Sequence, residues 1–259
     1  MKNMLFLSSL FALITVFSAC NESDPAPDIV DGVGTLQLNF RSTFNQNALV
    51  MYDETYDYEE DLDVRLQLFQ FYITDVVMIG EDEQEYELSE VELVSFKEVY
   101  TSDDAADGIN VTLSDLPSGK YTGIRFGIGV NPTLNATSPA DYQIGHPLED
   151  NYWSAAAGYV FFKIEGNTDL NKDGTLDDKL TFHIGRDDYL RDKELSHSFV
   201  INGGAMSTIN LEVDLYNILR NPDTGQFLDF NETQTDHTTN PEVAKFLADN
   251  MQRAITIKE

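Results

Sequence analysis

The amino-acid sequence predicts an all-β protein, a two-layer antiparallel β-sandwich with long loops and one short C-terminal helix. Apolar and polar residues alternate with a period of two in many segments after residue 34. Two turn-forming clusters, Pro117-Ser118-Gly119 and Asn202-Gly203-Gly204, separate neighbouring segments of this kind. Such alternation puts one face of each strand on a core and the other face in solvent, as antiparallel sandwiches require.

The chain begins with the parts of a secretory signal. Lys2 precedes a run over residues 4–17 that carries no charge, and small residues lead to Cys20. The segment over residues 16–20 resembles a bacterial lipobox, although Phe17 stands where leucine is commoner. We therefore expect a lipoprotein signal peptide over residues 1–19, cleavage before Cys20 and lipidation of Cys20. An ordinary signal peptide with a chance cysteine is the alternative, but the only cysteine of the chain has no disulfide partner.

The charge of the chain excludes two classes of partner. The formal net charge is −29, and loss of Lys2 with the signal peptide makes it −30 (−29 − 1). A chain this acidic is repelled by nucleic acid and by anionic lipid, so we expect neither as a partner. We expect the membrane to be met only through the lipid on Cys20.

Residues 20–33 read as a flexible acidic tether, since proline and acidic residues keep a segment extended and solvated. An acidic stretch after a lipidated cysteine resembles the export signal of Bacteroidetes surface lipoproteins. We expect an outer-membrane lipoprotein, periplasmic or surface-exposed, of a Gram-negative, Bacteroidetes-like bacterium. Residues 34–259 are expected to form one domain, because no internal linker or repeat interrupts them.

The strands are expected where alternation is clearest, for example at Leu36, Leu38 and Phe40. The expected strands cover residues 36–40, 64–79, 86–88, 93–96, 109–113, 122–130, 160–164, 180–184 and 209–215. Two connections, over residues 44–63 and 131–158, are long for a compact domain, and loops of that length are usually functional or mobile.

One helix is expected near the C-terminus. Asn240 is a good N-cap, Pro241 suits the first turn and Glu242 suits the positive end of the helix. Apolar residues then follow helical spacing to about Ala254: Val243, Phe246, Leu247 and Met251.

An acidic segment between two expected strands suggests a calcium loop. Oxygen-bearing side chains stand at its first, third and fifth positions and a glycine at its sixth, as in loops that wrap around calcium. The expected calcium ligands are Asp169, Asn171, Asp173, Thr175, Asp177 and Asp178. The twelfth position is Leu180, so the bidentate glutamate of an EF-hand is missing. An acidic hairpin turn in an already acidic protein is the alternative.

The four histidines are His146, His183, His197 and His237. Alternation puts His183 on the face opposite the apolar residues of its strand, so it does not simply fill the core. Each histidine taken singly is more often a surface residue than a ligand. No nucleophile or acid–base motif stands out, so we expect a binding protein and not an enzyme.

Several segments together resemble the MbnP family and its MbnP-like lipoproteins. The most specific are GKYTGIRFGIGVN over residues 119–131 and GYVFFKIEG over residues 158–166. Weaker matches cover residues 36–40, 66–79 (LQLFQFYITDVVMI), 182–185 (FHIG) and 237–257. The resemblance extends over nearly the whole chain after the tether and implies a β-sandwich with a binding role.

The resemblance also implies a metal. MbnP-family proteins are copper-binding proteins of the periplasm or cell surface, associated with methanobactin-type operons. In members that bind copper, histidines and a kynurenine made from tryptophan line the site, and a di-haem peroxidase-like partner makes that modification. Carried over to this chain, the copper ligands would be His183, His237 and modified Trp153, and calcium would be structural.

Two positions depart from the family pattern. Arg41 stands where a histidine is expected after the first strand, and Ala155 stands where many relatives have a second tryptophan. A cation facing the site would repel copper. The alternative function is therefore a surface binding or adhesion lipoprotein, with a glycan or protein ligand, that has lost the copper site. In that case Trp153 would only anchor the long loop. Tyr52, Tyr56 and Tyr58 would be available to stack on sugars, with packing as the equal alternative.

Overall fold

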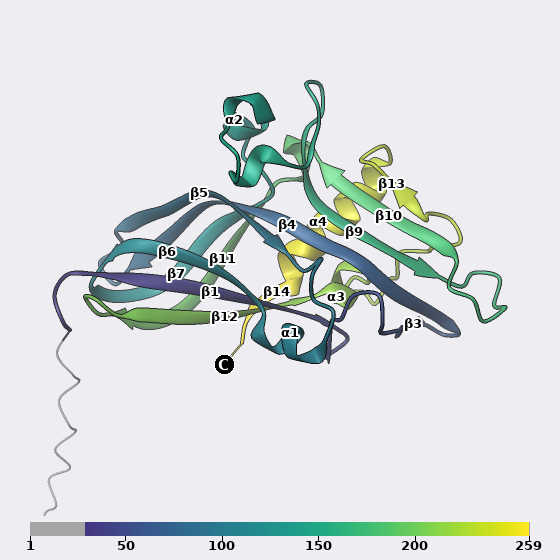
Figure 1. Cartoon of the computed structure of the whole chain (residues 1–259), viewed down its shortest axis with the longest axis horizontal. Helices are drawn as coiled ribbons and strands as arrows, with labels where there is room; N and C mark the ends of the chain where they lie inside the picture. The colour runs from purple at the N-terminus through teal and green to yellow at the C-terminus, as the bar shows by residue number, and fades with distance from the viewer. Residues whose placement is uncertain (1–28, 259) are drawn as a thin grey trace, which may run out of the picture.

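The computed structural model describes residues 29–258 and is built from two β-sheets packed face to face (Figure 1). The five-stranded sheet has the order β14 (Ile255–Ile257), β12 (Met206–Asp214), β1 (Val33–Phe44) and β2 (Asn47–Ala48), with β6 (Ile109–Pro117) also paired to β1. The all-β sandwich that the sequence predicts is therefore confirmed. The predicted signal peptide and Cys20 lie outside the described residues.

The second sheet has nine strands and carries the candidate site. Its order is β11 (Arg191–Ile201), β7 (Gly119–Ile128), β4 (Leu62–Gly80), β9 (Gly158–Thr168), β10 (Asp178–Gly185) and β13 (Thr235–Asp236). Strands β3 (Tyr56–Glu59) and β5 (Glu85–Ser95) pair with β4, and β8 (Tyr152–Ser154) pairs with β9.

The long strand β4 is the spine of the nine-stranded sheet. Its first half pairs with β9 and its second half with β7, while β3 and β5 pair along its other side. The register slips near Asp75, whose φ of 53° lies in the left-handed region. A β-bulge there bends the strand where its partner changes from β9 to β7.

The two sheets enclose one aromatic core. Phe40 of β1 meets Phe71 of β4 edge to face, with ring centroids 5.7 Å apart. Phe69 stacks on Phe96 at 5.4 Å, and all four rings are buried. Aromatic pairs of this geometry add about 0.5–1.5 kcal/mol each beyond the area that they bury. The period-two alternation in β1 thus reports the face that meets this core, whereas β4 is buried on both faces over residues 69–74.

Four α-helices and three single-turn 3₁₀ helices complete the described chain. They are α1 (Ser102–Asp107), α2 (Pro132–Asn135), α3 (Leu215–Leu219), α4 (Pro241–Ala254), η1 (Pro139–Asp141), η2 (Pro147–Glu149) and η3 (Asp187–Tyr189). No helix within residues 29–258 combines the length and apolar character needed to cross a membrane.

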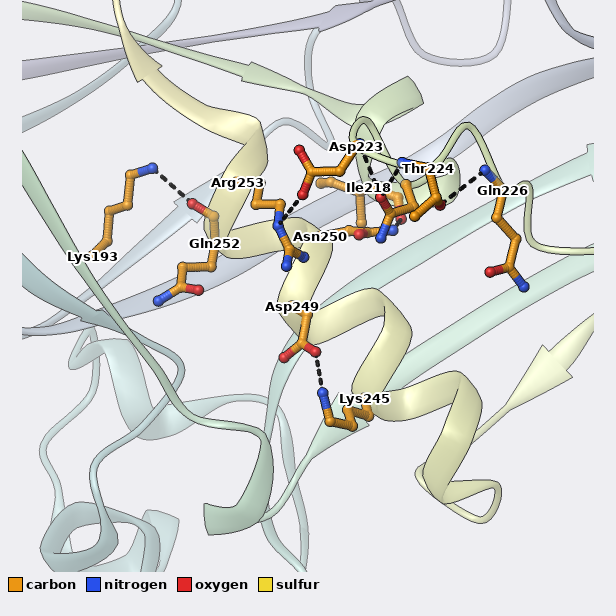
Figure 2. Close-up of polar contacts among 11 residues, drawn as sticks. Lys193, Ile218, Asp223, Thr224, Gln226, Lys245, Asp249, Asn250, Gln252 and Arg253 are labelled. Carbon is orange, nitrogen blue, oxygen red and sulfur yellow. Dashed lines mark hydrogen bonds and ion pairs between the residues drawn. The ribbon is translucent and has the colours of Figure 1, made fainter.

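Helix α4 is the helix that the sequence predicts. The Asn240 side chain accepts a hydrogen bond from the Glu242 N–H, which is the expected N-cap. Polar contacts tie the far end of the helix to the sandwich (Figure 2): Lys193 Nζ donates to the Gln252 carbonyl at 2.7 Å, and Arg253 pairs with Asp223 at 3.1 Å. These contacts fix α4 and hence the segment that leads into it.

The structure departs from the prediction in two respects. Strand β1 runs parallel to β12, and β13 runs parallel to β10, so the sandwich is not antiparallel throughout. The two short strands expected over residues 86–88 and 93–96 form one strand, β5. Further elements have no counterpart in the prediction: strands β2, β3, β8, β11, β13 and β14 and helices α1, α2 and α3. The inward positions of β11 are only half-buried and the others are exposed, so its apolar alternation is weak.

Candidate metal centre

Three aromatic side chains that lie far apart in the sequence meet at one end of the nine-stranded sheet. The ring centroids of His183 and His237 are 4.9 Å apart. The Trp153 ring lies 5.0 Å from His237 and 6.3 Å from His183, with both contacts edge to face. The structure thus brings together the three residues that the resemblance implies as copper ligands.

The parallel pairing of β10 and β13 explains why the two histidines are neighbours. Phe182 is in register with Asp236, and each of these two residues is followed by a histidine. Phe182 is buried in the core, and His183 therefore points to the opposite face, as the alternation predicts. His237 directly follows β13, and its ring lies beside that of His183.

The β8–β9 hairpin places Trp153. Tyr152 pairs with Tyr159 and Ser154 with Gly158, which holds the intervening Trp153 over the start of β9. Gly158 has a φ of 70°, and a Cβ atom there would lie 2.1 Å from Oδ1 of Asn135, so this tight hairpin needs glycine. Trp153 is 46% exposed, so one part of its indole faces solvent while its ring contacts both histidines.

His183 has a carboxylate partner. Its Nε2 atom lies 2.7 Å from Oε1 of Glu165, a residue of the neighbouring strand β9. Burial lowers the pKa of His183 below its ordinary value, while the Glu165 carboxylate acts in the opposite direction and raises it. Lys163, directly opposite His183 in the ladder, adds to the lowering, and burial lowers the pKa of Lys163 as well. The net effect favours the neutral imidazole that binds metals.

We expect His183 to titrate below the ordinary histidine value of about 6.5. Because the unfolded chain then binds the proton more tightly, His183 lowers the stability of the fold as the pH falls through about 6.5. Proton NMR of the imidazole signals across pH 4–8, with His183→Gln for assignment, measures the midpoint. A midpoint at or above the ordinary value would contradict this expectation.

His237 has a nitrogen without a partner. Its Nδ1 atom is buried and makes no hydrogen bond with any described residue. A buried polar atom without a partner costs about 1–3 kcal/mol, which a ligand at that atom would recover. An imidazole nitrogen is also a good donor for copper. The residues present therefore fit a metal held between the two histidines.

Thr238 joins the His237 segment to the strand of His183. Its hydroxyl donates to the His183 carbonyl at 3.1 Å and accepts from the Gly185 N–H at 3.0 Å. Thr238 is itself buried and has a φ of 58°, a conformation uncommon for a β-branched residue. The two hydrogen bonds hold this strained residue in place.

Replacing Thr238 with valine should destabilise the fold by about 1–3 kcal/mol, because the buried Gly185 N–H loses its acceptor. Urea unfolding measures the loss. Thr238→Ser is the control, since it retains the hydroxyl and should stay closer to the wild type. Equal stability of the valine variant and the wild type would show that these hydrogen bonds do not hold the segment.

A pocket of about 310 Å³ opens beside the three rings. Its wall combines the hairpin, the end of β10 and the segment after β13, with Trp153, Tyr159, Arg186, His237, Thr238 and Thr239 among its lining residues. His237 lines the pocket, whereas His183 does not. Within residues 29–258, no group of three or more histidine, cysteine, aspartate or glutamate side chains is arranged to hold a metal.

The acidic loop over residues 169–178 is folded back on its own backbone. Both carboxylate oxygens of Asp169 accept backbone N–H groups, from Asp173 at 3.1 Å and from Gly174 at 2.7 Å. Asn171 and Asp173 accept in the same way from the amides two residues ahead of them, and Asp178 accepts from the Leu170 N–H. The side chains at positions one, three and five thus turn inward. Thr175 accepts the Asp177 N–H through its carbonyl.

The two other histidines and two of the tyrosines considered for sugar binding have structural contacts elsewhere. His146 stacks on Tyr142 and accepts the Leu148 N–H through Nδ1, so it serves the loop structure. His197 lies on β11 and stacks on Phe199. In the 44–63 connection, sugar stacking is wrong for Tyr56 and Tyr58, which are 6% and 2% exposed and pack in the core.

The two departures from the family pattern lie outside the ring cluster. Arg41 is an exposed residue of β1 in the five-stranded sheet, beside Glu212 in register and against Gly108. It does not line the pocket next to the histidines. Ala155 is exposed at the tip of the β8–β9 hairpin. Arg41 therefore puts no cation between His183 and His237.

Sequence reasoning missed Glu165 and Thr238 as members of the site. Glu165 stands within the GYVFFKIEG segment, two residues after Lys163, so both share one face of the strand. Pairing β9 with β10 across the acidic loop would have put this face against His183. The β13 pairing that brings in His237 had no signal, because that strand has only two residues.

Comparison with known proteins identifies related chains. A family model, MbnP, matches residues 33–243, which is most of the chain. Among solved structures, MbnP from Methylosinus trichosporium is similar, with 12% sequence identity, a TM-score of 0.49, and coverage of 72% of this chain and 77% of that one. No curated protein sequence matches the chain.

Proposed function

This chain belongs to the MbnP family, and on that premise we propose that it is a cell-envelope lipoprotein that binds copper between His183 and His237. The observation that carries the proposal is the buried Nδ1 of His237, which has no partner among the described residues, in a ring whose centroid lies 4.9 Å from that of His183. Two imidazoles suit copper in either oxidation state. The role is binding, not turnover.

Trp153 would complete the ligand set after modification. An intact indole offers only an N–H donor and no lone pair for a metal. Opening the ring to kynurenine adds two oxygen atoms across the C2–C3 bond, and water then removes the formyl carbon as formate. The product presents a ketone oxygen and an aromatic amine. One dioxygen supplies both oxygen atoms; alternatively, two molecules of hydrogen peroxide supply them and release two waters. A di-haem peroxidase-like partner would catalyse this step, and the exposed part of Trp153 gives it access.

The modification is tested by intact-mass measurement before and after incubation with the haem partner and its oxidant. We expect a gain of about 4 Da, the difference between tryptophan and kynurenine. A Trp153→Phe variant should gain nothing, and tandem mass spectrometry should place the change at residue 153. An unchanged mass in the wild type, with active partner, would reject Trp153 as a ligand precursor.

For the acidic loop we propose a structural calcium ion. The inward-turned oxygens of Asp169, Asn171 and Asp173 are the feature that favours it. Calorimetry on chelator-treated protein should give a calcium affinity near the ~10⁻⁴–10⁻³ M typical of extracellular modules. Asp169→Ala with Asp173→Ala should abolish the heat, whereas Asp103→Ala on α1 should leave it unchanged. No heat from the wild type at millimolar calcium would leave the loop an acidic hairpin turn.

The second candidate function is a glycan-binding surface lipoprotein without copper. Tyr52 and Tyr100 favour it, because both are 49% exposed and their rings lie 6.0 Å apart. A pair of exposed aromatic rings can stack on sugar faces. If the mature protein holds no copper but retains glycan that Tyr52→Ala and Tyr100→Ala release, this function replaces the first.

A further inference from the structure

The contact between His183 and Glu165 determines which of the two ring nitrogens of His183 is free to bind a metal. Oε1 of Glu165 lies 2.7 Å from Nε2 of His183, and the two side chains are 35% and 17% exposed. Hydrogen bonds to a carboxylate are stronger than those between neutral groups, and partial burial protects this one from competing water. The contact is thus a firm constraint on the imidazole.

The register between β9 and β10 places Glu165 next to His183. Thr181 pairs with Glu165 and His183 with Lys163, so Glu165 is the diagonal neighbour of His183 on the same face. On its other side β9 pairs with β4, which holds the strand in the middle of the sheet. Diagonal neighbours of this kind are within reach of each other when one side chain is long. Both strands are fixed by neighbours, so the two groups cannot drift apart.

The chemistry of the pair then selects a tautomer. An ionised carboxylate only accepts hydrogen bonds, so the proton between the two groups belongs to Nε2 of His183. A neutral imidazole with its proton on Nε2 has its lone pair on Nδ1. Histidines that bind metals commonly donate their second N–H to a carboxylate in this way, which fixes the ring and makes the free nitrogen more basic.

We propose that Glu165 is a positioning residue that holds His183 as the Nε2–H tautomer and so presents Nδ1 to the metal. The metal-binding role of Nδ1 rests on the proposed copper function, but the tautomer itself is a property of the metal-free protein. The site then offers the Nδ1 atom of His183 together with the buried Nδ1 of His237. Glu165 itself touches no metal; it acts through His183.

The direct test is ¹⁵N NMR of the metal-free, histidine-labelled protein at pH 7.5. Long-range ¹H–¹⁵N spectra distinguish a protonated ring nitrogen from one with a free lone pair. We expect His183 to show Nε2–H and an unprotonated Nδ1. Glu165→Gln should mix the tautomers, because an amide can both donate to Nε2 and accept from it. Glu87→Gln, an exposed strand glutamate of the same sheet, is the matched control and should leave the His183 signals unchanged.

Copper binding supplies the second readout. Loss of an outer carboxylate typically lowers metal affinity about 10–100-fold, and we expect Glu165→Gln to fall in that range. The nitrogen hyperfine pattern of Cu(II) in electron paramagnetic resonance should change in this variant and not in Glu87→Gln.

The outcomes separate this inference from the proposed function. A proton on Nδ1 of His183, or a doubly protonated ring, in the wild type would overturn the inference whatever the variants do. Unchanged tautomer and affinity in Glu165→Gln would also overturn it. If the wild type shows the Nε2–H tautomer but never binds copper, the proposed function fails while the tautomer assignment stands.

Discussion

Replacing His237 with alanine is expected to lower copper affinity by at least roughly 100-fold, beyond the range typical of outer contacts. The imidazole at this position contributes the buried Nδ1 that has no other partner in the described chain. Competition titration with a copper chelator of known affinity measures the loss. The same change also removes the ring contacts of His237 with Trp153 and His183, so urea unfolding accompanies the titration, and we expect a folded variant with lost copper affinity.

A matched histidine distinguishes this effect from a general loss of imidazole. His197 lies on β11 and stacks on Phe199, away from the ring cluster, so His197→Ala should retain copper. Equal copper affinity in the wild type and in His237→Ala would show that copper, if bound, is held elsewhere. Equal losses in both variants would indicate adventitious surface binding.

Replacing Tyr58 with alanine is expected to cost about 3–5 kcal/mol of folding free energy, as for other large aromatic residues truncated in a core. Tyr58 is 2% exposed, and its ring stacks on Phe230 with centroids 4.4 Å apart. Its hydroxyl donates toward the carbonyls of Leu219 and Leu228, and burial raises its pKa far above the ordinary value. Urea unfolding followed by circular dichroism measures the cost.

Two further variants separate packing from hydrogen bonding. Tyr58→Phe keeps the ring and should lose only about 1–2 kcal/mol, the net contribution of a buried hydroxyl. Tyr100→Ala removes a half-exposed tyrosine and should cost under about 1 kcal/mol. A Tyr58→Ala variant as stable as Tyr100→Ala would mean that this end of the sandwich does not depend on the Tyr58 ring.

The predictable part of this fold is the part that local pattern controls. Residues 122–130 and 180–184 alternate cleanly. Residues 122–128 and 180–184 lie in β7 and β10, where one face of each strand meets the core, whereas residues 129 and 130 follow the end of β7. Helix α4 has its cap, its proline and its apolar spacing within one stretch of sequence, so it could be placed closely. The resemblance added Trp153, His183 and His237, which pattern alone would not have combined.

The unpredictable part depends on long-range pairing. The parallel ladders β1–β12 and β10–β13 join segments far apart in sequence, and alternation carries no information about strand direction. The burial of Tyr56 and Tyr58 was equally unpredictable from the sequence. Both lie in the long connection over residues 44–63, where no strand was expected, yet β3 pairs with β4 and turns the two rings inward. Glu165 gained its role only when the β9–β10 register set it beside His183.

The central claim is that His183, His237 and a modified Trp153 hold copper in the mature protein. Metal analysis and intact-mass measurement on protein purified from its own host test it most directly. We expect close to one copper per chain together with a gain of about 4 Da at residue 153. Protein with no copper and an unmodified Trp153 would contradict it.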